Sequence, residues 1–369
     1  MKSSIPIILL FLIVFLSTSC DKIEEIQKTT TQSRGEIAEV VVVMAVDQWK
    51  GSLGATVKEI MTDTIPCLPQ EEARFSLMHL DPTEFNNFLR HRNNVFYIIT
   101  LDDDSYSGKL MRKYISKDVI EKTKTDKKVQ IYAKNNEYAQ GQYSLFLVGN
   151  NKSEIQQYLT NEKEQIWERF YQRERNRLVA KLYAINEQTK LNDFILSRYA
   201  LKMRIPESYD VVKREENFIW LRFLSEKIDR HIWITYRDYT ATEQFNPTQI
   251  QALRDSIGSQ RMRADKLENS YPITETLIPI CAQKISLNKR FATEYRGLWK
   301  LANGTRGGGF IAYAFVDDSA KRLYYVEAFL YAPDNEKRRF IMELEAILRT
   351  AQPVSLQIAN TTKNKNQKQ

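Results

Sequence analysis

The feature that most constrains the fold is an apolar segment at residues 39–46 (EVVVVMAV), which shows no alternation of polar and apolar side chains. A half-exposed strand alternates with a period of two, whereas a strand that is covered on both sides is apolar throughout. Residues 95–101 (VFYIITL) have the same character. We therefore expect two buried strands in a mixed sheet with helices packed on it.

The other segments of the first half alternate between helical and extended patterns. Residues 47–54 lead into a predicted helix that ends near residue 62, and residues 74–80 are expected to form a strand. Residues 129–132 and 143–148 favour a β-hairpin, or two strands that flank a turn. A long helical run at residues 152–187, with an apolar stripe near the 3.6-residue period, connects this half to the next.

The second half is dominated by patterns of antiparallel strands. Residues 218–223 (FIWLRF) and 231–236 (HIWITY) are predicted to pair around a turn. Three more segments are predicted to form an antiparallel meander: residues 295–301, 309–316 and 323–331. A further strand is expected at residues 276–281, and helices are expected at residues 246–260 and 337–349.

Together these patterns predict an α+β protein with two mixed or antiparallel sheets that carry packed helices and are joined by a long helix. The predicted N-terminal half covers residues 37–199 and includes the connecting helix. The predicted C-terminal antiparallel half covers residues 200–352. The polar segment at residues 353–369 is expected to be a disordered tail.

The first twenty residues have the layout of an export signal. Lys2 is followed by a nearly unbroken apolar run at residues 5–16, and the small residues Ser17-Thr18-Ser19 precede Cys20. A positive start, a short apolar run and a small-residue cleavage site define a secretory signal peptide. The cysteine after the small residues resembles a lipobox, with Leu16 one position earlier than usual. This resemblance implies cleavage before Cys20 and a diacylglyceryl group on its thiol. The alternatives are an ordinary cleaved signal and a retained membrane helix.

The segment that follows Cys20 fits a lipid anchor. Residues 20–36 are polar and are expected to form a flexible tether. No later segment is apolar over the roughly 20 residues that a membrane helix needs. We therefore expect residues 1–19 to be removed as a signal peptide. The chain is then held at the cell envelope by the lipid, on the periplasmic face or at the cell surface.

The charge of the chain limits its partners. The formal net charge is +8, but Lys363, Lys365 and Lys368 lie in the predicted tail, so the folded part is only mildly basic. Such an excess is compatible with anionic lipid or polysaccharide nearby. The sequence has no nucleic-acid-binding motif, and we expect no nucleic-acid partner.

Two cysteines, Cys67 and Cys281, remain once Cys20 is assigned to the lipid. An exported compartment permits a disulfide between them. The two residues are far apart in the sequence, which leaves open a bridge or two buried free thiols. We favour the free thiols.

Four separated stretches resemble one family. They are VVVVMAVDQWKGSLG, MRIPESYDVVKREENFIWLRF, RGLWKLANGTRGGGFIAYAF and VEAFLYAPDNEKRRFIMELEAIL, in this order along the chain. Together they resemble a family of Bacteroidetes lipoproteins that is known only as a domain of unknown function, over about residues 37–351. The resemblance implies no activity and no catalytic residues. The second half is also weakly similar, in its order of elements, to the Mog1/PsbP-like fold, which speaks to fold and not to function.

The search for catalytic or metal-binding motifs gives little. The three histidines, His79, His91 and His231, have no second ligand at metal-binding spacing, and neither HExxH nor Gly-x-Ser-x-Gly occurs. We expect no metal and no cofactor. Two weaker signals are an acidic run at residues 102–104, which follows a buried strand, and the pair Gly51 and Gly54 before a helix. The acidic run suits a cation or acid–base chemistry, and the glycines suit an anion, but we favour a solvated turn and close packing.

The segment Gly307-Gly308-Gly309 precedes a predicted strand, which three glycines weaken. They therefore indicate either a bulge or the close approach of another backbone or of a ligand, and we favour the bulge. If a ligand or partner binds here, Gly307, Gly308, Gly309 and the nearby Trp299 are the residues that contact it. The other aromatic side chains of the meander are expected to lie mainly in the core.

The function that these observations favour is that of a non-enzymatic binding or assembly module on the envelope. Its partner would be an envelope protein or glycan. The alternative is a hydrolase of envelope glycan or peptide that uses acidic side chains such as Asp102, Asp103 and Asp104.

Overall fold

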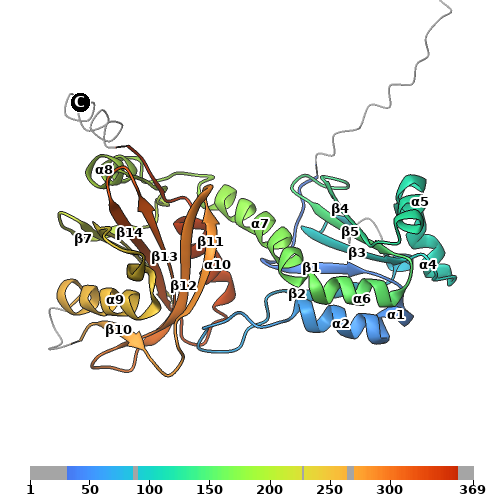
Figure 1. Ribbon diagram of the computed structural model, residues 1–369, viewed down its shortest axis with the longest axis horizontal. Coiled ribbons are helices and arrows are strands. Elements are labelled where there is room, and N and C mark those ends of the chain that lie inside the picture. The colour runs from blue at the N-terminus through green and yellow to red at the C-terminus, as the bar shows by residue number, and fades with distance from the viewer. Residues whose placement is uncertain (1–30, 86–89, 227, 264–269, 356–369) are drawn as a thin grey trace, which may run out of the picture.

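A computed structural model describes residues 31–85, 90–226, 228–263 and 270–355 of the chain. The predicted signal peptide, Cys20 and residues 356–369 of the predicted tail lie outside the described residues. Two sheets lie side by side, and helix α7 (Lys163–Leu182) runs between them (Figure 1). The predicted α+β class, with two helix-covered sheets joined by a long helix, is confirmed.

The first sheet has five strands in the order β2-β1-β3-β5-β4. The strands β1 (Glu39–Val43), β2 (Ser76–Leu80), β3 (Asn94–Thr100) and β5 (Tyr143–Gly149) are parallel. The edge strand β4 (Gln130–Asn135) is antiparallel to β5, as the hairpin pattern predicted. β3 and β5 are buried along their whole length, and β1 is buried except at Glu39, because helices cover both faces.

The helices of the first domain form a layer on each side of this sheet. One layer consists of α1 (Val46–Lys50), α2 (Ser52–Met61), α6 (Lys152–Asn161) and α7, whose apolar side chains pack with Val40 and Val42 of β1. The opposite layer contains α4 (Tyr106–Met111), the short helix η2 (Arg112–Tyr114) and α5 (Lys117–Asp126), which pack with Val41 and Val43. Successive valines of β1 thus serve different cores, which explains the lack of alternation in the sequence. A further short helix, η1 (Pro82–Glu84), follows β2.

The end of the predicted tether lies along the first domain. The backbone N–H of Ser33 donates to the carbonyl of Gln140, and that of Arg34 donates to the carbonyl of His91, both at 2.9 Å. These two bonds hold residues 33–34 against the loops that contain His91 and Gln140, a few residues before β1 begins at Glu39.

The second sheet is antiparallel and has eight strands. Its main path runs β10-β12-β13-β14-β9-β8-β7, and β11 pairs with β12 beside β10. The strands are β7 (Asp210–Arg214), β8 (Phe218–Leu224), β9 (Asp229–Asp238), β10 (Pro272–Glu275), β11 (Cys281–Leu287), β12 (Arg290–Leu301), β13 (Gly307–Asp317) and β14 (Arg322–Tyr331). The predicted meander corresponds to β12, β13 and β14, and the predicted pair corresponds to β8 and β9. A separate two-stranded ribbon joins β6 (Leu201–Lys202) to β15 (Gln352–Pro353).

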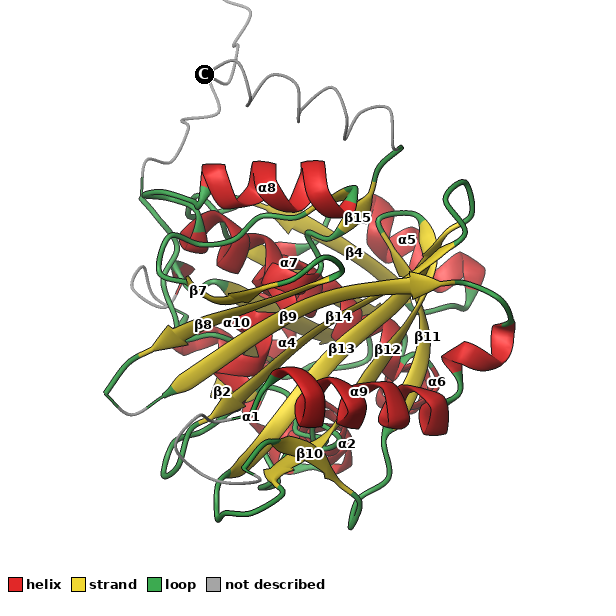
Figure 2. Ribbon diagram, turned by 90° about the vertical axis from the view of Figure 1, so that its left-hand side faces the viewer, coloured by secondary structure: helices red, strands yellow, loops and turns green. Residues whose placement is uncertain are grey.

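Each face of the second sheet has its own helices. α8 (Thr189–Tyr199) and α10 (Arg338–Leu348) cover one face, where Tyr313 and Tyr324 are buried. α9 (Pro247–Arg261) lies across the other face (Figure 2), and the short helix η3 (Thr242–Phe245) precedes it. Trp299, Phe310 and Tyr325 are buried in the core on this face. These aromatic side chains lie in the core, as expected from the sequence.

Two predicted elements differ from the structure. Residues 276–281 do not form a strand: β10 ends at Glu275 and β11 begins at Cys281. Pro279 lies between them, and a proline cannot donate a ladder hydrogen bond. The helical run predicted at residues 152–187 forms two helices, α6 and α7, which are separated at Glu162, and it ends at Leu182. α8 was assigned to the N-terminal half but packs on the second sheet.

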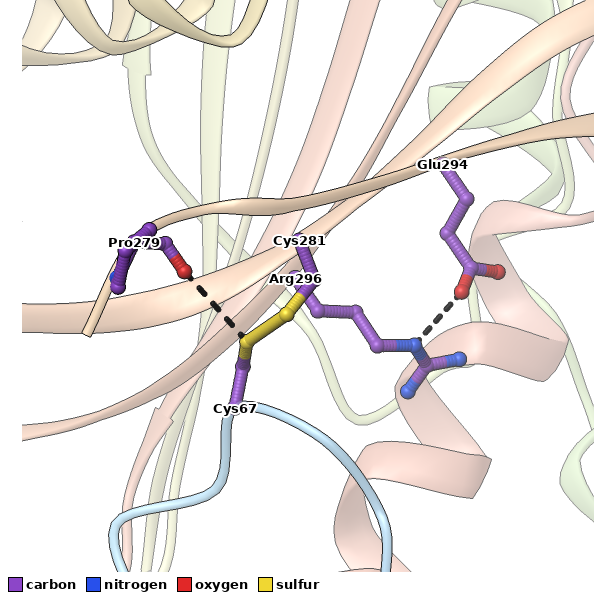
Figure 3. Close-up of a disulfide and its surroundings, with 5 residues drawn as sticks. All are labelled: Cys67, Pro279, Cys281, Glu294 and Arg296. Carbon is purple, nitrogen blue, oxygen red and sulfur yellow. Dashed lines mark hydrogen bonds and ion pairs between the residues drawn. A yellow bond between two sulfur atoms is a disulfide. The ribbon is translucent and has the colours of Figure 1, made fainter.

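A disulfide joins the two domains. Cys67, on the loop at residues 62–75 between α2 and β2, is bonded to Cys281 at the start of β11, and their Cα atoms are 6.9 Å apart (Figure 3). The Cys67 sulfur also lies 3.7 Å from the carbonyl oxygen of Pro279. The preference for two free thiols was therefore wrong. Sequence alone did not reveal that a first-domain loop reaches the second sheet.

The same loop makes further contacts with the second domain, and we name residues 62–75 the clasp loop. Ile65 and Leu68 pack into the second core. The Glu72 carboxylate accepts the backbone N–H groups of Lys337 and Arg338, at 2.6 and 2.7 Å. These two N–H groups stand at the start of α10 and have no partner within the helix, so a first-domain side chain caps a second-domain helix.

Helix α10 contributes to both domains. Its residues Met342 and Ala346 belong to the core of the first domain, whereas Leu344 and Ile347 belong to that of the second. Glu345 on the same helix forms ion pairs with Arg175 of α7 at 3.4 Å and Arg296 of β12 at 2.9 Å, among others. Burial opposes ionisation of Glu345, but these arginines outweigh it and lower its pKa to about 2. The domain contact is therefore both apolar and charged.

Candidate functional site

A broad concave surface lies on the α9 face of the second sheet. α9 begins at Pro247, and before it the short helix η3 borders β11 and the adjoining ends of β12 and β13 and leaves them partly uncovered. The result is a hollow of about 710 Å³. We name it the aromatic hollow, and its lining residues are Tyr239, Thr242, Glu243, Phe245, Asn246, Pro247, Ala282, Lys284, Arg290, Phe291, Thr293, Val316 and Asp318.

Three aromatic rings form the apolar part of this hollow. Phe245 meets Phe291 edge to face, with ring centres 5.6 Å apart, and meets Tyr239 in the same way at 6.1 Å. Tyr295 fixes the position of Phe245, because its hydroxyl donates to the Phe245 carbonyl at 2.6 Å. Phe291 is 55% exposed, so its ring adds apolar surface that is open to a partner.

Charged and polar side chains surround the rings. Lys284 and Arg290 bring positive charge from β11 and β12, while Glu243 and Asp318 bring negative charge. Binding sites commonly combine an apolar surface with a few polar groups that fix orientation, in volumes of about 300–1,000 Å³. The aromatic hollow has both properties.

A second candidate position lies in the first domain, at the place where parallel sheets of other α/β proteins commonly bind ligands. The strand order reverses between β1 and β3, and ligands of such sheets bind at the carboxyl ends of the strands there. In this chain the Gln48 side-chain amide spans that position and donates to Thr100 Oγ1 at 2.6 Å and to Asp103 Oδ2 at 3.0 Å. The nearby Asp81 carboxylate accepts from the Val46 N–H and the Ser107 hydroxyl. The chain's own side chains therefore occupy this edge.

The acidic run and the glycine pair have local roles. Asp103 accepts the backbone N–H of Ser105, and Asp104 lies 3.7 Å from Arg112 at the surface. The Gly51 N–H donates to the carbonyls of Asp47 and Gln48. A Cβ on Gly54 would lie 1.9 Å from the carbonyl oxygen of Trp49, so that glycine permits close packing. These contacts agree with a turn and with close packing rather than with ligand binding.

The glycine run does not form a bulge, and that expectation was wrong. Gly307, Gly308 and Gly309 pair with Lys300, Trp299 and Leu298 in unbroken register, and none of the three has a positive φ. Instead, a Cβ at Gly308 would lie 2.1 Å from the carbonyl oxygen of Leu330. The close approach of another backbone, which was the second possibility, explains this glycine.

Trp299 is engaged with the same carbonyl. Its indole N–H donates to the Leu330 oxygen at 3.0 Å, and the side chain is buried. Gly309 faces the clasp loop, where a Cβ would lie 3.4 Å from Leu68. The residues that the sequence suggested for a partner contact, Gly307, Gly308, Gly309 and Trp299, thus contact other parts of this chain and do not line the aromatic hollow.

Two of the three histidines, His79 and His231, have structural partners. His231 Nε2 lies 3.1 Å from Asp229 Oδ1, and its Nδ1 accepts from the Trp220 indole at 3.1 Å. His79 Nε2 donates to the Met44 carbonyl at 2.9 Å. Burial lowers the pKa of both imidazoles. Over the described parts of the chain, no group of three or more histidine, cysteine, aspartate or glutamate side chains is arranged to hold a metal ion.

A buried ion pair lies beneath α9, and sequence reasoning missed it. Arg254 of α9 donates to Glu327 of β14 at 3.0 Å, and both side chains are fully buried. The Tyr325 hydroxyl also donates to Glu327 at 2.6 Å. Burial outweighs the attraction of Arg254 and raises the pKa of Glu327 to about 7. A glutamate at an apolar strand position was the only signal in the sequence.

Two family models match the chain. A domain of unknown function, DUF8532, matches residues 33–183, and another, DUF4837, matches residues 187–350. Each model matches less than half of the chain, and the two matched regions do not overlap. DUF8532 coincides with the first sheet and its helices, and DUF4837 with the second, which includes the aromatic hollow. The resemblance to a family of unknown function is thereby confirmed.

Similarity to solved structures is weak. A point mutant of the protein Mog1 has a TM-score of 0.29 at 6% identity, over 43% of this chain and 94% of that chain. The Ran-binding protein Mog1p of Saccharomyces cerevisiae gives 0.29 at 7% identity, over 43% and 93%. The lipid transfer and protein localization domain of human StarD13 gives 0.21 at 8% identity, over 40% and 90%. No curated protein matches the chain.

Proposed function

We propose that this chain is an exported lipoprotein, anchored to an envelope membrane through lipid on Cys20, and that its DUF4837 domain binds an envelope protein. The aromatic hollow is the observation that carries the binding role. It is a concave surface with exposed aromatic rings and charges of both signs, on a domain that is fastened to its neighbour.

The disulfide supports the exported location. Disulfides form and persist in oxidising compartments outside the cytosol, so the Cys67–Cys281 bond fits an exported protein. Within the described residues, no helix combines the length and apolar character needed to span a bilayer. The lipobox-like sequence that ends at Cys20 supplies the proposed anchor.

An extended protein segment is the class of partner that the hollow fits best. β11 forms one wall of the hollow and pairs only with β12 among the described strands, so its other edge is open to strand addition. Six of its seven residues, from Cys281 to Ser286, are exposed or partly exposed. A strand added to β11 would place side chains near Phe291 and Lys284.

The anchor and the binding role have separate tests. Cys20→Ala is expected to abolish fatty-acid labelling of the protein, because the thiol is the proposed attachment atom; unchanged labelling would contradict the anchor. For the hollow, Phe291→Ala is compared with Leu277→Ala, since both residues are exposed (55% and 87%) but only Phe291 lines the hollow.

Crosslinking in intact cells, followed by purification, gives the readout for the hollow. We expect Phe291→Ala to lose a protein partner that Leu277→Ala retains, with both variants folded to the wild-type melting temperature. Equal recovery of the partner by both variants would contradict the proposed role.

A further inference from the structure

Arg237, near the end of β9, lacks the carboxylate partner that several arginines of the second domain have among the described residues. Among the described residues, neither its Nε nor its Nη2 has a hydrogen-bond partner, although both atoms are buried. By contrast, Arg222, Arg254 and Arg296 each have a carboxylate within 3.0 Å. Burial lowers the pKa of Arg237, and no charged neighbour offsets this effect.

An unpaired, partly buried cation is costly. A buried donor that loses its water without gaining a partner destabilises the fold by the cost of desolvation, and the cost is larger for a charged group. An apolar side chain would avoid this cost, so the guanidinium is unfavourable here unless its charge has a use. The surroundings of Arg237 indicate what that use is.

Arg237 lines a pocket of about 170 Å³ between the sheet and the C-terminal half of α9. The pocket contains a second guanidinium, that of Arg261, and polar groups of Thr235, Ser256 and Gln260, but no aspartate or glutamate lines it. Arg261 is itself held by Asn217 at 3.0 Å and by Glu215 at 3.4 Å. The lining therefore carries net positive charge, with Arg237 as its unpaired member.

We propose that this pocket binds a small oxyanion, a phosphate or carboxylate group, with Arg237 as its anchor. The planar guanidinium fork matches such groups, and the hydrogen bonds are charge-assisted. The volume equals that of roughly five to six water molecules in the liquid, which suits one such group rather than a large ligand. The site is separate from the aromatic hollow: the two have no lining residue in common.

Thermal melting of the full-length chain tests the proposal. Inorganic phosphate is titrated in one arm and acetate in the other, with chloride added to hold ionic strength constant. At ten times the Kd, the ligand is expected to raise the melting temperature by roughly 3 °C or more, because it binds only the folded state. Arg237→Met is expected to abolish this rise. Arg322→Met is the matched control, since Arg322 lies on the adjacent strand with its guanidinium 4.3 Å from the Tyr236 ring, and it should retain the rise.

The two arms also identify the chemistry. A response to phosphate assigns a phosphate-bearing ligand, and a response to acetate alone assigns a carboxylate; either supports the proposal. No response in the wild type, or an equal response in Arg237→Met, would overturn it. Equilibrium dialysis of the wild type with the radiolabelled anion gives a measurement that is independent of variant folding. About one anion per chain is expected, and binding to fewer than about one chain in ten would overturn the site.

Discussion

In the first domain, helices cover both faces of the sheet, and the chain's own side chains occupy the carboxyl edge. In the second domain, α8 and α10 cover one face, but α9 leaves the other face open beyond Pro247. The first domain has the strand order that places ligands at a switch point in other proteins, yet Gln48 closes that position. Strand order alone therefore does not locate a binding surface. The length of the covering helix decides which surface stays accessible.

The two domains also differ in what they bury. In the first domain, Glu174 of α7 is buried, but its partner Arg177 is 22% exposed, whereas both members of the Arg254–Glu327 pair beneath α9 are fully buried. The α9 face is therefore expected to be sensitive to the loss of either charge of this pair.

The largest effect is expected from Glu327→Ala, which leaves Arg254 buried without its carboxylate. Loss of one partner from a buried pair typically lowers the free energy of unfolding by about 3–5 kcal/mol. Glu216→Ala is the matched control, because the Arg198–Glu216 pair is 3.9 Å long with Glu216 largely exposed, and it should cost less than about 1 kcal/mol. Urea unfolding at pH 8 measures both. Similar losses for the two variants would remove the contrast between the cores.

The next effect concerns pH. Burial raises the pKa of Glu327 from 4.5 to about 7, so between these values the folded protein holds a proton that the unfolded chain has released. The Glu327 contribution to stability is therefore greatest below pH 4.5 and falls as the pH rises to about 7, by on the order of 3 kcal/mol. We expect the stability of the wild type, relative to Glu327→Gln, to fall between pH 5 and pH 8. A difference that stays constant or grows over this range would contradict the raised pKa.

The disulfide connects the two contrasted domains, and its removal has the third effect. Cys67→Ser with Cys281→Ser is expected to lower the free energy of unfolding by about 2–4 kcal/mol, since the bridge limits the unfolded chain. The fold itself should persist, because Glu72 and α10 still join the domains. Denaturant midpoints with and without reductant provide the measurement. A wild-type midpoint that does not respond to reductant would show that the bridge contributes nothing.

A smaller effect distinguishes two neighbouring glycines. Gly308→Ala would bring a Cβ to 2.1 Å from the Leu330 oxygen, whereas Gly309→Ala would bring one only to 3.4 Å from Leu68. Overpacking of the first kind costs about 1–3 kcal/mol, and the second should be nearly neutral. Melting curves of the two variants test this. Equal melting temperatures would mean that the sheet adjusts and that close backbone approach does not explain Gly308.

Much of the fold was predictable because local patterns carry it. The unbroken apolar runs of β1 and β3 predicted buried strands, and the spacing of turns predicted the β12-β13-β14 meander. The apolar stripe of the final helix was equally clear, but its division between two cores was not, since both cores need the same residue types.

The candidate sites were not predictable in this way. The lining of the aromatic hollow comes from three segments, near residues 239–247, 282–293 and 316–318, which only the folded sheet brings together. The disulfide depends on the clasp loop, whose reach no pattern encodes. Arg237 resembles any other strand arginine until its missing partner is seen. These features depend on contacts between residues that are far apart in the sequence, which local patterns do not reveal.

The most direct test of the central claim compares the two domains in living cells. A photo-crosslinking residue is placed at position 291, in the aromatic hollow, or at position 106, where Tyr106 is 76% exposed near the carboxyl edge of the first sheet. Both chains keep Cys20. We predict a specific protein adduct from position 291 and none from position 106. An adduct from position 106 alone would contradict the account and place the binding surface on the first domain.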